Sequence, residues 1–179
     1  MRVDLRPLRA ERGGTLVIDC HETVESRVEG IPFVEPVTGR LTLHNLGAAL
    51  RIEGSVRTAA RLVCDRCASP YRYRLHAAVD EELNWADVAS PDAGDVTYLV
   101  GAGDAVGLDV GVLAREVLVL ALPMVARCGP DCRGLCDGCG ADLRIEPCRC
   151  PPEARRAREV DPRLRALAAW REAEPSGPA

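Results

Sequence analysis

Residues 50–85 read LRIEGSVRTAARLVCDRCASPYRYRLHAAVDEELNW, and this stretch decides the fold. Apolar or small side chains occupy most even positions from residue 50 to residue 62, with polar residues between them. After Cys64-Asp65-Arg66-Cys67 the alternation returns, now with apolar side chains at most odd positions from residue 71. Period-two alternation over this length is typical of a strand with one buried face. The stretch therefore predicts two long strands joined by a cysteine-bearing turn.

The register of this hairpin follows from the same alternation. Antiparallel pairing about the middle of the turn places Val56 opposite Leu75 and Ile52 opposite Val79. A slip of one residue would set apolar positions against polar ones throughout, so that slip is disfavoured. A shift of two residues is compatible with the pattern.

Shorter elements are indicated before the hairpin and directly after it. Residues 15–18 predict a short strand. Residues 25–40 carry two prolines and predict an edge strand or a loop. Residues 86–108 are rich in Asp and Gly and predict a loop, a brief strand over 96–100 and a second loop.

Two helices are predicted further along the chain. Asp109 is a suitable N-cap for a buried helix over 110–122, which Pro123 would stop. Asp161-Pro162 can begin a short helix, because Pro is favoured at the first helical position.

The predicted fold is α+β: an antiparallel β-sheet with a long central hairpin, one packed helix, and a zinc-knuckle C-terminal segment with a short terminal helix. We expect a β-rich domain over residues 1–126. A cysteine-rich zinc-binding segment with the terminal helix would occupy 127–173. Residues 174–179 would form a disordered tail.

Composition limits the classes of protein that fit. Of the 179 residues 47% are apolar and 3% aromatic, so the core is expected to be aliphatic. The net charge of −4 does not indicate a general affinity for nucleic acid or membranes. Without an apolar run long enough to cross a bilayer, the chain is expected to be cytoplasmic. Its nine cysteines are then expected to be reduced thiols, which favours metal binding over disulfides.

Six of these cysteines lie close together near the C-terminus: Cys128, Cys132, Cys136, Cys139, Cys148 and Cys150. Zinc takes four thiolates in a tetrahedral arrangement, and tight turns can supply them. The sequence therefore predicts a structural zinc site in this segment.

Six candidate ligands leave the choice of four open. The compact set formed by the first four cysteines of the cluster is favoured. The alternative set is Cys136, Cys139, Cys148 and Cys150, which spans a loop as zinc ribbons do. In either set four thiolates close the coordination sphere, which indicates a structural and not a catalytic metal.

Cys64 and Cys67 form half of a further site at the hairpin turn. They could join Cys148 and Cys150 around a second zinc ion, so one or two ions are expected. They could also be incidental thiols of a turn, or a redox dithiol. The redox reading is the weakest, because thioredoxin-type CxxC motifs open a helix.

The polar face of the hairpin carries a group of cations. In the predicted register Arg57 lies opposite Arg74, and Arg61, Arg72 and His76 flank them. Like charges in opposite positions are destabilising, so an anionic partner such as RNA phosphate would suit this face. The alternative is a solvated face balanced by nearby carboxylates.

No catalytic residue is predicted, and the chain is expected not to be an enzyme. His21-Glu22 starts like a zinc-peptidase motif but lacks the second His. The three scattered His residues offer little for acid–base catalysis.

Several of these segments resemble the bacterial YceD-like family of large ribosomal RNA subunit accumulation proteins. The matching segments run through the chain in order: DLRPL at 4–8, CDRC at 64–67, the helix over 109–123 ending in LALP, the cysteine cluster over 128–150, and DPRLRAL at 161–167. Arg144 departs from the family, which often has Asn at this position.

The resemblance implies a non-enzymatic factor in 23S rRNA accumulation and large-subunit biogenesis, with ribosomal RNA or a pre-ribosomal protein complex as partner. It also implies metal binding, in which zinc stabilises the domain without being its activity. A zinc-stabilised protein–protein adaptor without RNA contact is the alternative, and a thiol oxidoreductase using Cys64 and Cys67 is a third. No membrane or small-molecule partner is expected, and the sequence does not indicate an oligomeric state.

Overall fold

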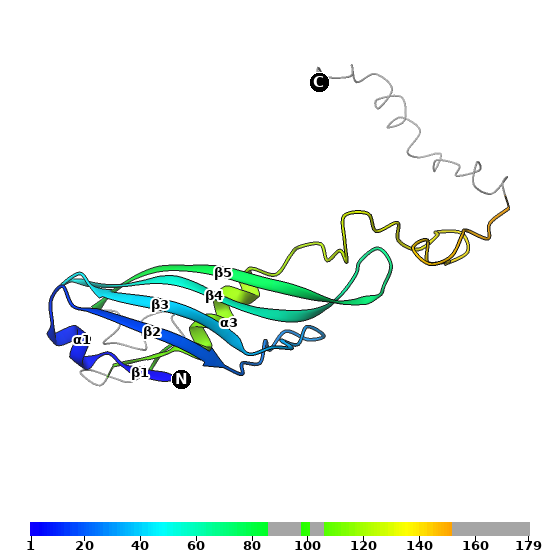
Figure 1. Cartoon of the computed structure of the whole chain (residues 1–179). Helices are drawn as coiled ribbons and strands as arrows, with labels where there is room; N and C mark the ends of the chain where they lie inside the picture. Colours follow the sequence, from blue (N-terminus) through cyan, green and yellow to red (C-terminus); the bar gives the residue numbers. More distant parts are fainter. Residues whose placement is uncertain (86–97, 101–105, 152–179) are drawn as a thin grey trace, which may run out of the picture. The chain divides into compact units, whose positions relative to one another are not determined.

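The computed structural model describes residues 1–85, 98–100 and 106–151. The chain forms two compact units, Met1–Pro130 and Asp131–Ala179. In its described part the first unit contains a four-stranded sheet, a three-stranded sheet and two helices. Figure 1 shows the long strands of the larger sheet side by side. All strand pairs are antiparallel. The fold is α+β, as the sequence predicts.

The larger sheet contains the predicted hairpin. Its strands are β2 (Thr15–Glu22), β3 (Val37–Asn45), β4 (Ala49–Val63) and β5 (Pro70–Asn84), in the order β2-β3-β4-β5. β4 and β5 are 15 residues each and form the hairpin. The short strand predicted over 15–18 is the first half of β2.

The predicted register of the hairpin is wrong by two residues. Val56 lies opposite Ala77, and Ile52 lies opposite Glu81. The reason is the turn, which extends past the second cysteine: the Cys64 N–H donates to the Ser69 carbonyl at 3.0 Å. Because side chains alternate between the two faces of a strand, a shift of two residues leaves every side chain of β5 on the expected face.

The interpretation of residues 25–40 is also wrong in part. Strand β3 begins at Val37 and lies inside the sheet between β2 and β4, and the edge strands of the sheet are β2 and β5. Val37, Leu41 and Leu43 alternate along β3 and are buried. The prolines that suggested an edge both precede the strand.

The smaller sheet has the order β1-β7-β6, with β1 (Arg2–Asp4), β7 (Gly107–Asp109) and β6 (Leu99–Val100). β6 is the described end of the brief strand predicted over 96–100. The short helix α1 (Arg6–Ala10), which the sequence analysis did not predict, follows β1.

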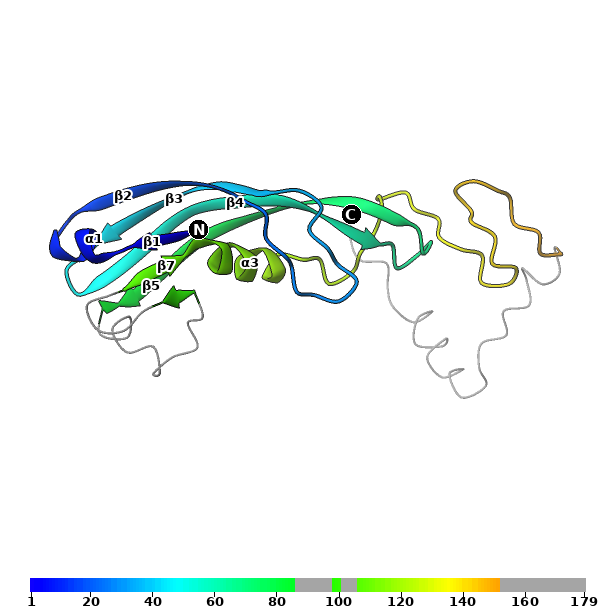
Figure 2. The same cartoon turned by 90° about the horizontal axis from the view of Figure 1, so that it is seen from below.

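Helix α3 (Val110–Leu120) forms as predicted and ends two residues earlier than expected. The Asp109 side chain caps it by accepting a hydrogen bond from the Val112 N–H at 3.2 Å. Figure 2 shows α3 against one face of the larger sheet, where it contacts β4 and β5.

The core of the first unit lies between this sheet face and α3. It is mainly aliphatic, as the composition predicts, although Trp85 and Tyr98 are also buried in it. The helix buries Val110, Leu113, Ala114 and Leu118. Leu41, Leu50 and Ile52 are fully buried on the sheet side. Burying one Leu or Ile side chain contributes about 1.5–3 kcal/mol. One face of the hairpin is thereby fixed against α3, and the opposite face is left to solvent.

The second unit is described over residues 131–151. Its backbone runs through turns, with one isolated bridge between Leu135 and Asp142. The predicted terminal helix at 161–170 and the predicted tail at 174–179 lie outside the described residues.

Asn45, at the end of β3, joins three parts of the first unit through its side chain and is only 2% exposed. Its amide nitrogen donates to the carbonyls of Leu8, Arg9 and Glu11 at 2.8–3.2 Å. Its Oδ1 accepts from the Gly47 N–H at 2.8 Å and from the Trp85 indole at 3.1 Å. The N-terminal segment, the β3–β4 turn and the end of β5 therefore depend on one side chain.

Asn45→Ala should lower the free energy of unfolding by about 2–4 kcal/mol, because several buried donors and acceptors lose their partner. Urea unfolding followed by circular dichroism measures this. Thr42→Ala, on the exposed face of the same strand, is the control and should change stability by less than about 1 kcal/mol. Equal effects of the two substitutions would contradict the role given to Asn45.

Candidate metal centres and a cationic sheet face

The β4–β5 turn has the geometry of a metal-binding knuckle. The Cys64 N–H donates to the Ser69 carbonyl at 3.0 Å, and the Ala68 N–H donates back to the Cys64 carbonyl at 2.8 Å. Ala68 has a φ of 53°, in the left-handed region. This path turns the chain tightly around both cysteines. Their side chains are almost fully buried, at 1% exposed for Cys64 and 4% for Cys67.

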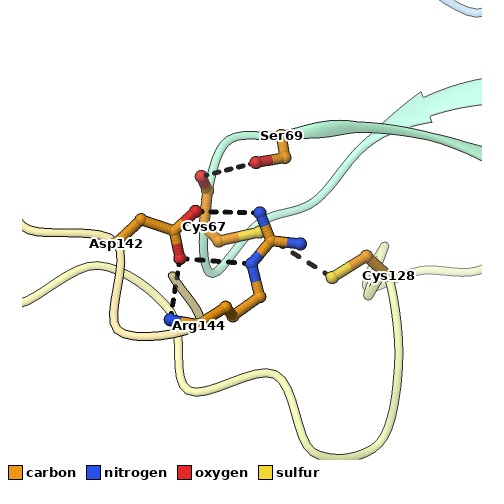
Figure 3. Close-up of polar contacts among 5 residues, drawn as sticks. All are labelled: Cys67, Ser69, Cys128, Asp142 and Arg144. Atoms are coloured by element: carbon orange, nitrogen blue, oxygen red, sulfur yellow. Dashed lines mark hydrogen bonds and ion pairs between the residues drawn. The ribbon is translucent and has the colours of Figure 1, made fainter. Parts of the chain in front are cut away.

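The segment after α3 is held against this turn by two hydrogen bonds. The Asp65 N–H donates to the Ala126 carbonyl at 2.8 Å, and the Ala126 N–H donates to Asp65 Oδ2 at 2.7 Å. The next cysteine, Cys128, thereby reaches the knuckle, where its Sγ lies 3.8 Å from that of Cys67, as Figure 3 shows.

Cys132 completes the first group of thiols. It follows Cys128 by four residues along the chain. The Sγ atoms of Cys64, Cys67, Cys128 and Cys132 all lie within 4.8 Å of one another. We call this group tetrad 1.

The second unit contains tetrad 2, formed by Cys136, Cys139, Cys148 and Cys150, whose Sγ atoms also lie within 4.8 Å of one another. Cys136 Sγ is 3.3 Å from Cys148 Sγ and 3.6 Å from Cys150 Sγ. A Cβ added to Gly138 would lie 2.6 Å from Cys150 Sγ, so only glycine fits there.

The loop between the two halves of tetrad 2 is braced by an ion pair. The Arg144 guanidinium donates to both carboxylate oxygens of Asp142 at 3.1 and 2.8 Å, and the Arg144 N–H donates to Oδ1 at 3.0 Å (Figure 3). A bidentate contact of this kind fixes the side chains as well as the charges.

The two tetrads are built on the same turn. In tetrad 2 the Cys136 N–H donates to the Ala141 carbonyl, and the Gly140 N–H donates to the Cys136 carbonyl, both at 2.8 Å. These bonds have the same spacing along the chain as those that start at Cys64. Gly140 has a φ of 70° and occupies the place of Ala68. Each CxxC motif is therefore one copy of the same knuckle.

Backbone N–H groups around each knuckle favour the thiolate form of its cysteines. The N–H of Cys128 is the largest contributor that lowers the pKa of Cys64, to about 6. The N–H groups of Cys139 and Gly138 lower the pKa of Cys136. Hydrogen bonds with Cys136 first, and then with the other two sulfurs of tetrad 2, raise the pKa of Cys150 to about 12. Four converging sulfurs cannot all ionise without a cation among them.

The donor sets fit a metal ion that prefers sulfur. Four thiols within bonding reach of one point are the ligand set of structural zinc sites, and they also suit other soft metals. All nine cysteines are free thiols and none forms a disulfide. Each tetrad could therefore hold one metal ion.

Tyr71 provides a further observation at tetrad 1. Tyr71 lies on β5 opposite Leu62 of β4, and therefore on the same face of the hairpin as Cys64. Its hydroxyl is buried and has no hydrogen-bond partner among the described residues. Burial, and then the charge of the Cys64 sulfur, raise its pKa. The Tyr71 hydroxyl could therefore donate a hydrogen bond to a metal-bound thiolate, whose sulfur carries negative charge.

The grouping of the thiols corrects part of the sequence analysis. Tetrad 2 is the alternative set of four. The favoured set, Cys128 with Cys132, Cys136 and Cys139, is not brought together as one group. Cys64 and Cys67 join Cys128 and Cys132, not Cys148 and Cys150 as proposed. Spacing could not show this, because tetrad 1 depends on a contact between segments 61 residues apart.

The predicted cations do share the exposed face of the larger sheet, but their pairing differs. Arg57 lies opposite His76, Arg61 lies opposite Arg72, and Arg74 lies opposite Ala59. The expectation that Arg57 faces Arg74 is therefore wrong, because the hairpin register is shifted by two. Arg61 and Arg72 are the opposed pair of like charges, beside the knuckle.

Glycine is expected to suit the first knuckle better than Ala68, because a side chain is strained at positive φ. Ala68→Gly should stabilise the protein by about 0.5–1 kcal/mol, and Gly140→Ala should destabilise it by a similar amount. Thermal unfolding measures both. Ala78→Gly, at an exposed and extended site in β5, is the control and should lower the melting temperature. A lower melting temperature for Ala68→Gly would contradict the assignment of the knuckle.

Comparison with known proteins places these features in a family. The family described as large ribosomal RNA subunit accumulation protein YceD matches residues 52–170, which include both tetrads and α3. No solved structure matches the chain. No helix of the described part is both long enough and apolar enough to cross a bilayer.

Individual relatives are found in bacteria and plants. An uncharacterized protein of Mycobacterium tuberculosis is 27% identical over 169 residues, which cover 91% of this chain and 77% of the relative. The chloroplastic large ribosomal RNA subunit accumulation protein YCED homolog 1 of Arabidopsis thaliana is 24% identical and that of Zea mays 28%. The alignments cover 73% and 65% of this chain, and it spans about half the length of each plant relative, 48% and 49%. The match over 52–170 shows that the chain belongs to the YceD family of large ribosomal RNA subunit accumulation proteins.

Proposed function

We propose that this protein supports the accumulation of large-subunit ribosomal RNA by binding that RNA, free or in a pre-ribosomal complex, through the cationic end of its larger sheet. Two zinc ions, one in each tetrad, would hold the structure and take no part in a reaction. The family supports the role in rRNA accumulation. The observation that carries the RNA contact is the separation of charge along the exposed sheet face.

In the half of the larger sheet that lies away from the β4–β5 turn, the arginines are paired with carboxylates. Arg40 pairs with Asp19 at 2.6 Å. Arg51 pairs with Glu53 at 2.6 Å and with Asp80 at 3.1 Å. This half has little net positive charge to offer to an anion.

The half nearer the knuckle is different. Arg57, Arg61 and Arg74 form no ion pair with any carboxylate of the described residues, whereas Arg72 pairs with Glu35. Arg57, Arg72, Arg74 and His76 line a hollow of about 370 Å³. Unpaired guanidinium groups on an exposed face suit phosphate, which they can bind in a bidentate manner. The charge of this half supports RNA phosphate as its ligand.

A structural role for zinc follows from the ligand sets. Four thiolates leave no open coordination position for a substrate or water, as in closed zinc sites. The CxxC of tetrad 1 also lies between two strands and does not open a helix, which argues against a thioredoxin-type function. We therefore propose no catalytic residue, and a cytoplasmic location beside assembling ribosomes.

RNA bound to the full-length protein can be identified by crosslinking and sequencing, and large-subunit rRNA is the expected product. Arg57→Ala with Arg74→Ala should weaken binding of an rRNA fragment about tenfold, and should lower the slope of log K against log salt by about two. Arg2→Ala with Arg51→Ala removes the same charge from positions outside both hollows and is the control. Equal loss in both double variants, or no loss in the first, would refute the proposed RNA surface.

Native mass spectrometry of protein prepared without chelators should show two zinc ions. Cys64→Ser should remove one ion and Cys148→Ser the other, because thiolate ligands of closed sites are not readily replaced. Cys20→Ala is the control, since Cys20 is a buried thiol outside both tetrads and its loss should leave two ions. Protein without zinc, or Cys64→Ser protein that keeps two ions, would refute the zinc assignment.

The protein–protein adaptor is a second candidate, and one observation favours it. The segment that ends α3 and follows it exposes apolar side chains, with Leu120 at 85% and Met124 at 99% exposure. Exposed apolar side chains in succession can mark a protein-binding site. Association with ribosomal proteins that survives ribonuclease and high salt would favour the adaptor over the RNA-binding factor.

A further inference from the structure

We infer that the cationic sheet face recognises the sugar–phosphate backbone of double-helical RNA and not the bases of a single strand. This inference rests on the proposed function and specifies the class of RNA. Its basis is what the exposed face of the larger sheet carries and what it lacks.

Among the residues that the structure describes, the exposed face lacks the platforms that single-strand binders use. Such proteins stack successive bases on Phe, Tyr or Trp side chains. The aromatic side chains of the hairpin, Tyr71 and Tyr73, lie on the core side, where they contact each other edge to face with ring centroids 6.3 Å apart. Phe33 also packs against the core, and Trp85 is buried within it.

The register shows which side chains form the exposed face instead. One row crosses all four strands as His21, Thr38, Arg57 and His76. The next two rows toward the knuckle carry Arg74 and then the pair Arg61 and Arg72. The rings on this face among the described residues are small, polar imidazoles. Guanidinium, imidazole and hydroxyl groups bind phosphate oxygens and 2′-hydroxyls, and those contacts carry no base sequence.

The central arginine is already oriented for such contacts. Arg57 Nε donates to Thr38 Oγ1 at 3.2 Å, which fixes the guanidinium against β3 and leaves its terminal amino groups available. Two adjoining hollows share Thr38, Arg57 and His76 in their linings. The arginine therefore lies at the centre of a broad polar surface.

The cations form one patch on two neighbouring strands. Rows on one strand repeat about every 6.7 Å, and neighbouring strands lie about 4.8 Å apart. Arg57 and Arg61 on β4 therefore lie close to Arg74 on β5, with Arg72 and its partner Glu35 beside them. The wide, shallow minor groove of A-form RNA presents 2′-hydroxyls between two lines of phosphates, and a flat surface can contact it without entering a groove.

The test uses the full-length protein and three nucleic acids in fluorescence anisotropy titrations at several salt concentrations. The first probe is a 16-base-pair RNA duplex, about the length that double-stranded RNA modules span. The second is an unstructured RNA strand of twice that length, which carries nearly the same number of phosphates. The third is a DNA duplex of the same sequence as the RNA duplex.

The RNA duplex should bind at least tenfold more tightly than the single strand and more tightly than the DNA duplex, and changing its sequence should have little effect. Arg61→Ala should lower the salt slope for the RNA duplex by about one, whereas Arg51→Ala should not. Equal or tighter binding of the single strand would overturn the inference and leave RNA binding intact. Failure to bind any RNA probe would overturn the proposed RNA contact together with it.

Discussion

The turn from Cys64 to Ser69 is the constraint on which the rest of the first unit depends. One backbone hydrogen bond between these two residues closes the hairpin and fixes which residue of β4 meets which residue of β5. That register places Arg57 beside His76 and Arg61 beside Arg72. The same turn positions two buried thiols for Cys128. The thiol group and the cationic face are thus two results of one local geometry.

Repetition of the turn in the second unit shows what the geometry requires. Both knuckles need a residue at positive φ four positions after the first cysteine. One uses glycine and the other alanine, so the strain at Ala68 is accepted where the surrounding strands and the bonds to Ala126 over-determine the path. The described residues of the second unit, 131–151, form no such sheet around the knuckle, which uses Gly138 and Gly140. These residues bury few side chains, so a metal ion would add most to folding there.

Much of this architecture follows from the sequence, and the exceptions have physical causes. Alternation over residues 50–85 predicts the hairpin and its faces, and Asp109 and Pro123 predict the bounds of α3 to within two residues. The register was wrong because alanine gives no sign that it will adopt a left-handed conformation. The ligand sets were open because proximity along the chain does not decide which thiols meet in space. The sequence does not place β3 inside the sheet, because the two prolines that precede it suggest an edge strand or a loop. It does not show the role of Asn45 either, because a buried Asn resembles a turn residue in sequence.

The position of β3 has a consequence for how the family is delimited. The family match begins at residue 52, within β4, whereas β2 and β3 both precede it. A fragment cut at that boundary would lose the neighbour of β4 and expose a long, unpaired strand edge. Open edges of this kind recruit strands from other molecules. Such a fragment would keep every thiol of both tetrads and would still be prone to swap strands or to aggregate. The sheet order, and not the extent of sequence similarity, therefore decides where the chain can be shortened.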